Sequence, residues 1–142
     1  MKNTLIAATV ALIALAFAPA ASAAGDCGTV KLYDKNNTRQ RVYGVKLLEV
    51  DGNPEWNRKY LKAVPVGSHT FKIGEQIPNS ELSQQVARWN DRSIRTRELT
   101  IDVQPNVLYV IGAKFDPDQR TDVKNYWAPI VLRDEGHPCS LD

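Results

Sequence analysis

The sequence lacks a strong excess of either positive or negative charge. Its 18 lysines and arginines face 16 aspartates and glutamates, so the formal net charge at pH 7 is only +2. A domain this close to neutrality exerts little long-range attraction on nucleic acid or on anionic lipid. The composition therefore argues against a nucleic-acid-binding protein. Methionine is also scarce, since Met1 is the only one, and a chain without internal thioethers fits an oxidising environment.

Motifs that carry catalytic chemistry are missing as well. The sequence contains no Gly-x-Ser-x-Gly, no His-Glu-x-x-His and no glycine-rich phosphate loop. Paired carboxylates such as Asp51 and Glu55 could serve a hydrolase in principle. Acidic side chains on turns are, however, ordinary surface groups. We therefore predict a protein that is not an enzyme and that has no cofactor.

The longest apolar run lies at the N-terminus. Lys2 precedes an uncharged stretch over residues 5–18, and Ala21-Ser22-Ala23 has the small residues that a signal peptidase requires. The run is too short for a stable membrane anchor, which is the alternative interpretation. We predict that residues 1–23 are a cleaved signal peptide and that residues 24–142 form one periplasmic domain without a transmembrane segment.

The two cysteines, Cys27 and Cys139, stand near the two ends of the predicted mature chain. In an oxidising compartment such a pair is expected to form a disulfide bond. The chain-entropy model assigns about 4–5 kcal/mol to a bond that closes so long a loop. A lipid anchor on Cys27 is the alternative, but Asp26 stands where lipidation requires a small residue. The bond would also remove Cys139 as the nucleophile of a Cys–His pair.

Apolar and polar residues alternate along most of the chain after the leader. The alternation and the turn residues between the runs predict seven short strands, over residues 30–32, 42–50, 59–64, 69–73, 98–103, 107–115 and 127–132. Residues 107–115 are apolar on both faces, so they are expected at the centre of a sheet. Pro129 predicts an edge position for the last strand. The pattern is typical of an all-β fold, a single antiparallel β-sandwich.

One segment breaks this alternation. In residues 79–90, Leu82, Val86 and Trp89 follow one another at helical spacing. The spacing predicts a short helix with Asn79 or Ser80 as its N-cap. The helix would be an insertion between two strands, and insertions on a rigid sheet often carry function.

Several short motifs follow one another along the middle of the chain, namely Val50-Asp51-Gly52, residues 65–70, residues 98–101, residues 108–111 and a final strand that contains Trp127. In this order they resemble the small exported β-sandwich modules related to PEGA domains, and the resemblance covers residues 43–132. Residues 53–56 depart from the namesake turn of that family, and the helical insertion lengthens the connection after Ile73. The resemblance implies a β-sandwich and a non-catalytic envelope component, and it leaves the ligand open.

The two histidines favour structural interpretations. His69 follows a turn, where an imidazole can hydrogen-bond the backbone and begin a strand. His137 lies close to Asp134 and Glu135, but a structural metal usually needs about four ligands fixed by the fold. We therefore predict no metal site in the tail.

Three aspartates follow one another at calcium-loop spacing in residues 116–122. Asp116, Asp118 and Asp122 could supply oxygen ligands, but the glycine and the closing glutamate of such a loop are missing. The alternative is a solvated loop whose aspartates cap turns. We predict that second arrangement.

The strongest candidate for a binding site is the arginine-rich segment 88–97. It contains one tryptophan, Trp89, and four arginines, which are Arg88, Arg92, Arg95 and Arg97. Tryptophan and arginine are enriched at binding hot spots, and arginine binds carboxylates and phosphates bidentately. The alternative is a solvated edge strand protected by its charges, with Trp89 in the core.

The sequence as a whole indicates a non-enzymatic periplasmic protein that binds or assists other components of the cell envelope. An envelope protein or an acidic glycan would be its partner. A secreted enzyme inhibitor or an immunity-type protein, which acts through residues 79–97, is the alternative. A hydrolase is the third class of function that the sequence leaves open.

Overall fold

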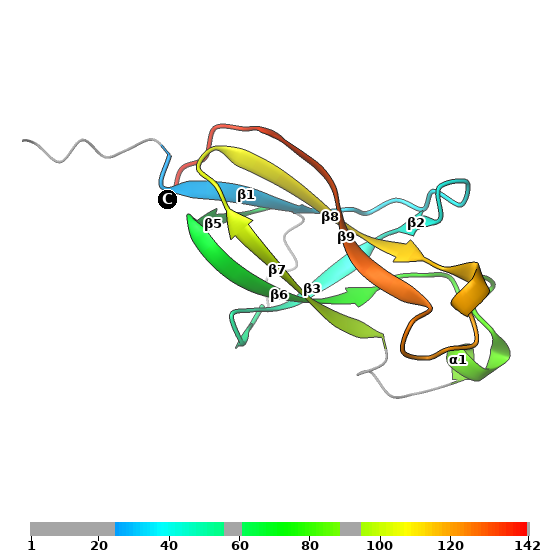
Figure 1. Ribbon diagram of the computed structural model, residues 1–142. Helices are drawn as coiled ribbons and strands as arrows, with labels where there is room; N and C mark the ends of the chain where they lie inside the picture. Colours follow the sequence, from blue (N-terminus) through cyan, green and yellow to red (C-terminus); the bar gives the residue numbers. More distant parts are fainter. Residues whose placement is uncertain (1–24, 56–60, 89–94, 142) are drawn as a thin grey trace, which may run out of the picture.

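The computed structural model describes residues 25–55, 61–88 and 95–141. These residues form nine strands, one short α-helix and one turn of 3-10 helix, η1 (Pro117–Gln119). The strands make two sheets that pack face to face (Figure 1), so the predicted all-β fold is confirmed. The predicted signal peptide, Trp89 and Arg92 lie outside the described residues.

The first sheet is arranged around its longest inner strand. It contains β1 (Cys27–Leu32), β2 (Val42–Tyr43), β5 (Leu61–Pro65), β8 (Val107–Phe115) and β9 (Trp127–Gly136). One edge of β8 pairs with β9, and its other edge pairs with β1 and β2. The predicted central and edge positions of β8 and β9 are therefore confirmed. β1 and β8 run parallel, which departs from an entirely antiparallel sandwich.

The second sheet is antiparallel throughout. Its strands lie in the order β4 (Asn53–Pro54), β3 (Val45–Val50), β6 (Gly67–Glu75) and β7 (Thr96–Val103). Residues 51–52 form the tight turn between β3 and β4, and both have positive φ angles. The alternation predicted for β6 and β7 is present, because Phe71, Ile73 and Val103 are completely buried.

The chain crosses between the two sheets four times, and two of these crossings lie at glycines. The prediction of one strand over residues 42–50 is wrong, because the chain leaves the first sheet after β2 and enters the second at β3. Gly44 lies at this crossing, where a Cβ atom would stand 3.1 Å from the Tyr33 carbonyl oxygen. Another crossing joins β5 to β6 at Gly67, whose φ of 127° few other residues adopt.

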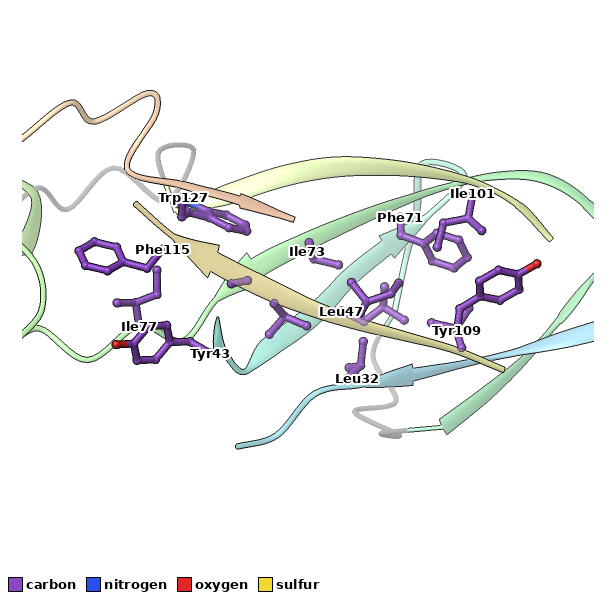
Figure 2. Packing of buried hydrophobic residues seen from close by; sticks show 14 of the residues in the cluster. Leu32, Tyr43, Leu47, Phe71, Ile73, Ile77, Ile101, Tyr109, Phe115 and Trp127 are labelled. Carbon is purple, nitrogen blue, oxygen red and sulfur yellow. The ribbon is translucent and has the colours of Figure 1, made fainter. Parts of the chain in front are cut away.

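The core is one continuous apolar cluster between the sheets (Figure 2). Tyr43, Ile77, Phe115 and Trp127 fill one end of it, and the rings of Tyr43 and Phe115 meet edge to face at 6.2 Å. Large aromatic side chains bury most apolar area per residue, so they contribute strongly to stability. The core therefore extends to the end of the sandwich from which the longer connections leave.

The predicted disulfide is confirmed. Cys27 and Cys139 are bonded with their Cα atoms 5.7 Å apart, so Cys27 is not a lipid anchor and Cys139 is not a free nucleophile. Asn106, in the turn between β7 and β8, forms hydrogen bonds with the backbone of both cysteines. Its N–H donates to the Cys27 carbonyl at 2.8 Å, and its Oδ1 accepts from the Cys139 N–H at 3.1 Å. We call this region the disulfide end.

The predicted helical insertion is present but shorter than expected. α1 (Gln84–Arg88) has little more than one turn, and Ser83 caps it by accepting the N–H of Val86 at 3.2 Å. The predicted caps at Asn79 and Ser80 are wrong, since those residues lie in the preceding turn. Leu82 and Val86 are buried as predicted. Within the described residues, no helix has the length and apolar composition that a membrane crossing needs.

Candidate functional site

Three connections leave the sandwich at the end opposite the disulfide. They join β1 to β2, β6 to β7 and β8 to β9, and Figure 1 shows them together near α1 and η1. We define the loop end as residues 33–41, 76–88 and 116–126. Loops at one end of a rigid sandwich are a common place for recognition, because the sheets fix their relative positions.

A buried carboxylate anchors two of these connections. The Glu75 side chain, at the end of β6, has no exposed surface. Its Oε1 accepts a hydrogen bond from the Arg95 Nε at 2.5 Å and another from the Tyr126 hydroxyl at 3.0 Å. Its Oε2 accepts the backbone N–H of Ile77. Glu75 thus joins both ends of the β6–β7 connection to the end of the β8–β9 connection.

The electrostatics of this cluster follow from burial and from the shared carboxylate. Burial, reinforced by the charge and the hydrogen bond of Glu75, raises the pKa of Tyr126. The hydrogen bond to Glu75 likewise raises the pKa of Arg95. Tyr126 therefore stays neutral and Arg95 stays charged at any physiological pH. The cluster is therefore an ion pair between Glu75 and Arg95 with the Tyr126 hydroxyl as an additional donor.

Arg97 forms a second attachment to the β8–β9 connection. Its Nη2 donates to the carbonyl oxygen of Lys124 at 2.7 Å, and its guanidinium lies over the ring of Trp127 at 5.3 Å. The Trp127 indole N–H is buried and has no hydrogen-bond partner among the residues that the structure describes. Arg97 and Trp127 therefore close the side of the sandwich where β7 and β9 approach each other.

The predicted arginine-rich site is divided by the structure. Arg88 is exposed at the end of α1, whereas the guanidinium groups of Arg95 and Arg97 contact Glu75, Lys124 and Trp127 inside the molecule. Trp89 and Arg92 lie outside the described residues. Among the described arginines of this segment, only Arg88 extends into solvent without a partner inside the domain.

Other cations are exposed on the neighbouring connections, and sequence reasoning did not single them out. They are Lys35, Arg39 and Arg41 before β2, and Arg120 and Lys124 before β9. They are distant from Arg88 in the sequence, so only the fold brings them to the same end. None of them has a carboxylate partner within ion-pair distance among the residues that the structure describes.

Charge is distributed unevenly over this nearly neutral domain. The described residues of segments 33–46, 74–97 and 112–129, which form the loop-end half, contain ten lysines and arginines and six carboxylates. The other described residues contain four lysines and arginines and eight carboxylates. The loop-end half is therefore cationic and the disulfide-end half is anionic, which a net charge of +2 conceals.

The acidic residues of the β8–β9 connection stabilise its own turns. Asp116 Oδ1 accepts the N–H of Asp118 at 3.0 Å and caps η1, and Asp122 Oδ1 accepts the N–H of Lys124 at 2.8 Å. This hydrogen bond is the first cause of the lowered pKa of Asp122. The predicted capping role is therefore confirmed. No group of three or more histidine, cysteine or acidic side chains in the described part of the chain could hold a metal ion.

The remaining carboxylates of interest lie outside the loop end. Asp51 Oδ2 lies 2.6 Å from the His69 Nδ1, and Glu55 forms an ion pair with Lys62. The predicted backbone hydrogen bond of His69 is present, because its Nε2 lies 2.9 Å from the Pro65 carbonyl oxygen. Asp51 and Glu55 thus each have a different partner.

Comparisons with known proteins supply no relative for this chain. A scan against protein-family models gave no match, and searches of the curated proteins and of the solved structures gave none either. The PEGA-type resemblance therefore stays a prediction, and the functional argument rests on the residues of the loop end.

Proposed function

We propose that this protein is a non-enzymatic binding or accessory module of the cell envelope, which holds an acidic partner at its loop end. The proposal places the protein in the periplasm, in keeping with the signal peptide predicted for residues 1–23. The single observation that carries it is the collection of exposed cations on three separate connections at one end of the sandwich, none of which forms an ion pair with a described residue.

The chemistry of these side chains favours a carboxylate-bearing or phosphate-bearing partner. Arg39, Arg88 and Arg120 present planar guanidinium groups, which bind such groups bidentately. The excess of positive charge in this half also attracts an acidic surface before contact. An acidic envelope protein or an acidic glycan would fit this surface.

The frame beneath these cations is suited to recognition. Arg95 and Tyr126 hold two of the connections on the sheets through hydrogen bonds to the buried Glu75 carboxylate. A surface that is ordered before binding loses less conformational entropy when the partner docks. The loop end therefore combines exposed charge with a pre-organised base, as a recognition surface requires.

The test is capture of a partner from periplasmic extract by the immobilised domain. We expect an acidic envelope component to be retained at low salt and released at high salt, because exposed ion pairs are screened over about 8 Å at physiological ionic strength. Arg88→Ser/Arg120→Ser should reduce capture. The matched variant Lys31→Ser/Lys72→Ser, which removes the same charge from the other half, should not.

Three outcomes would contradict the proposal. Equal capture by both double variants and by the wild-type domain would show that the loop end is not the binding surface. Capture of a single enzyme in one-to-one ratio, with loss of its activity, would instead support the inhibitor that was the alternative prediction. Turnover of a cell-wall substrate by the purified domain would exclude a purely binding role.

A further inference from the structure

A second feature lies on the other half of the molecule, and neither the binding proposal nor the core explains it. His69, near the start of β6, has an acceptor at each ring nitrogen. Its Nδ1 lies 2.6 Å from Asp51 Oδ2, in the turn between β3 and β4. Its Nε2 lies 2.9 Å from the carbonyl oxygen of Pro65, the last residue of β5. The imidazole thereby joins two segments that belong to different sheets.

The protonation state of the ring decides whether both contacts are hydrogen bonds. A carboxylate and a backbone carbonyl can only accept, so each contact needs an N–H on the ring. The imidazolium ion has two N–H groups and makes both bonds. A neutral imidazole has one, so one of the two contacts would place a nitrogen lone pair against an oxygen lone pair.

We propose that His69 is a proton-dependent clamp between the β3–β4 turn and the β5–β6 corner. When the ring carries two protons, it holds the Asp51 turn and the Pro65 carbonyl together. When the ring loses a proton, one of the two attachments opens. The device is independent of the loop end, because none of its three residues belongs to that surface.

A hydrogen bond from the backbone of Thr70 orients the Asp51 carboxylate for this role. Its Oδ1 accepts the N–H of Thr70 at 2.8 Å, which leaves Oδ2 directed at the imidazole. The hydrogen bond from His69, followed by that from Thr70, lowers the pKa of Asp51. Asp51 is therefore ionised throughout the range in which histidine titrates. Because the Asp51 carboxylate stays charged over this range, only the number of protons on the His69 ring changes.

Few other charges act on the ring. On β7, Asp102 stands opposite Ser68, one position after Ile101, which pairs with His69. On β3 and β6, Glu49 and Lys72 form an ion pair with each other at 3.0 Å. The neighbouring aromatic ring, Phe71, is tilted at a centroid distance of 6.5 Å. Asp51 is the one charged group in direct contact with the imidazole among the described residues.

The corner that the clamp holds is an exposed part of the surface. Val66 follows Pro65, is 45% exposed, and donates its N–H to the carbonyl oxygen of Asp26 at 2.9 Å. Opening the contact at Pro65 would weaken this attachment of the corner to the chain just before β1. The clamp therefore links proton concentration to the order of the β5–β6 corner.

Amide hydrogen exchange at Val66 and Thr70 tests the clamp. After correction for the intrinsic exchange rate, we expect the protection of at least one of these amides to fall about tenfold between about pH 5 and pH 8. A hydrogen bond to a charged group typically contributes enough free energy to change the protection by this factor. The wild-type imidazole signals should show both ring N–H groups of His69 at the lower pH.

The chain supplies its own control, because His137 is the only other histidine. His69→Gln should abolish the pH dependence of protection, and His137→Gln should preserve it. The clamp is refuted if the protection in the wild-type domain does not change with pH, or if His69→Gln and the wild-type domain respond alike. Should His69→Gln fail to fold, the wild-type imidazole signals still decide, because a ring with one N–H at pH 5 contradicts the proposal.

Discussion

At the disulfide end the chain is closed by the covalent bond between Cys27 and Cys139 and by the hydrogen bonds of Asn106. At the loop end three longer connections meet, and a buried carboxylate, Glu75, holds two of them. The first end is joined by a bond that does not depend on pH or salt. The second is joined by polar contacts, which depend on both the completeness of the network and the charge state of its members.

The comparison shows why stability and recognition can be separated in a small domain. The disulfide lowers the conformational entropy of the unfolded chain, and this stabilisation requires no particular residues on the surface. The loop end can then expose cations that would not themselves stabilise the fold. The following predictions test this division, beginning with the largest expected effect.

Removal of the disulfide should have the largest effect on stability. The bond spans 112 residues, and loop-closure entropy predicts a loss of about 4–5 kcal/mol in Cys27→Ser/Cys139→Ser. Urea denaturation of the variant, and of the wild-type domain with and without reductant, measures the loss. Intact-mass analysis should show two free thiols only after reduction. A denaturation midpoint that reductant does not change would contradict the assigned role.

Glu75→Gln should have the next largest effect. It leaves the Arg95 guanidinium without its counter-charge, and breaking a buried pair costs about 3–5 kcal/mol. Because the Arg95 side chain is 35% exposed, we expect about 2–3 kcal/mol. Glu49→Gln is the matched control, since the Glu49 side chain is 32% exposed whereas that of Glu75 is fully buried, so its loss should cost less than about 1 kcal/mol. Equal losses in the two variants, measured by urea denaturation, would show that Glu75 is not an anchor.

Tyr126 provides a test at high pH. Burial and Glu75 raise the pKa of its hydroxyl in the folded state, so its contribution is complete below the ordinary value near pH 10. That contribution is lost as the pH rises above this value, because the unfolded chain then releases the proton more readily. Tyr126→Phe should cost about 1 kcal/mol at neutral pH and should reduce the loss of stability above pH 10. Denaturation curves at pH 7 and pH 11 check both statements, and parallel pH dependences would contradict them.

A smaller effect is expected at low pH from Asp51. Its pKa is lowered below 3.8, chiefly by the hydrogen bond from His69. The associated stability is therefore present above that pH and is lost as the pH falls through the lowered value. Asp51→Asn should make acid unfolding less steep in this range, and fluorescence at pH 2–5 would record it. An unaltered acid transition would indicate that Asp51 does not contribute.

The smallest change in stability should come from Arg88→Ser. Arg88 is exposed and has no partner among the described residues, so its removal should cost less than about 0.5 kcal/mol. Arg95→Ser, by contrast, leaves the buried Glu75 unpaired and should cost clearly more. Thermal melts of the two variants distinguish a surface arginine from an anchoring one. Similar melting temperatures would mean that the division of the arginine segment is wrong.

The pattern of strands could be read from the sequence because local alternation records which face is buried. The centre of the first sheet, at residues 107–115, is apolar on both faces, and Pro129 marks its edge. The crossing at Gly44 could not be predicted in the same way. Apolar residues recur throughout residues 42–50, and only the close approach of Tyr33 and Gln76 shows where the chain changes sheets.

The candidate site was predicted only in part, because charge at a surface depends on long-range contacts. A run of arginines suggested one continuous binding segment, yet Arg95 lies against Glu75, 20 residues earlier, and Arg97 lies against Lys124, 27 residues later. Neither pairing has a local signal. The exposed cations at Arg39 and Arg120 join Arg88 only through the topology of the two sheets.

The central claim is that the exposed cations of the loop end recognise a partner without being needed for stability. The most direct test measures, in parallel, partner affinity and the urea midpoint of Arg88→Ser/Arg120→Ser and of Lys31→Ser/Lys72→Ser. We predict that the first variant binds about tenfold more weakly, loses much of its salt dependence and keeps its urea midpoint. The second should bind as the wild-type domain does. Equal affinities for both variants, or a loss of binding that accompanies an equal loss of stability, would contradict the account.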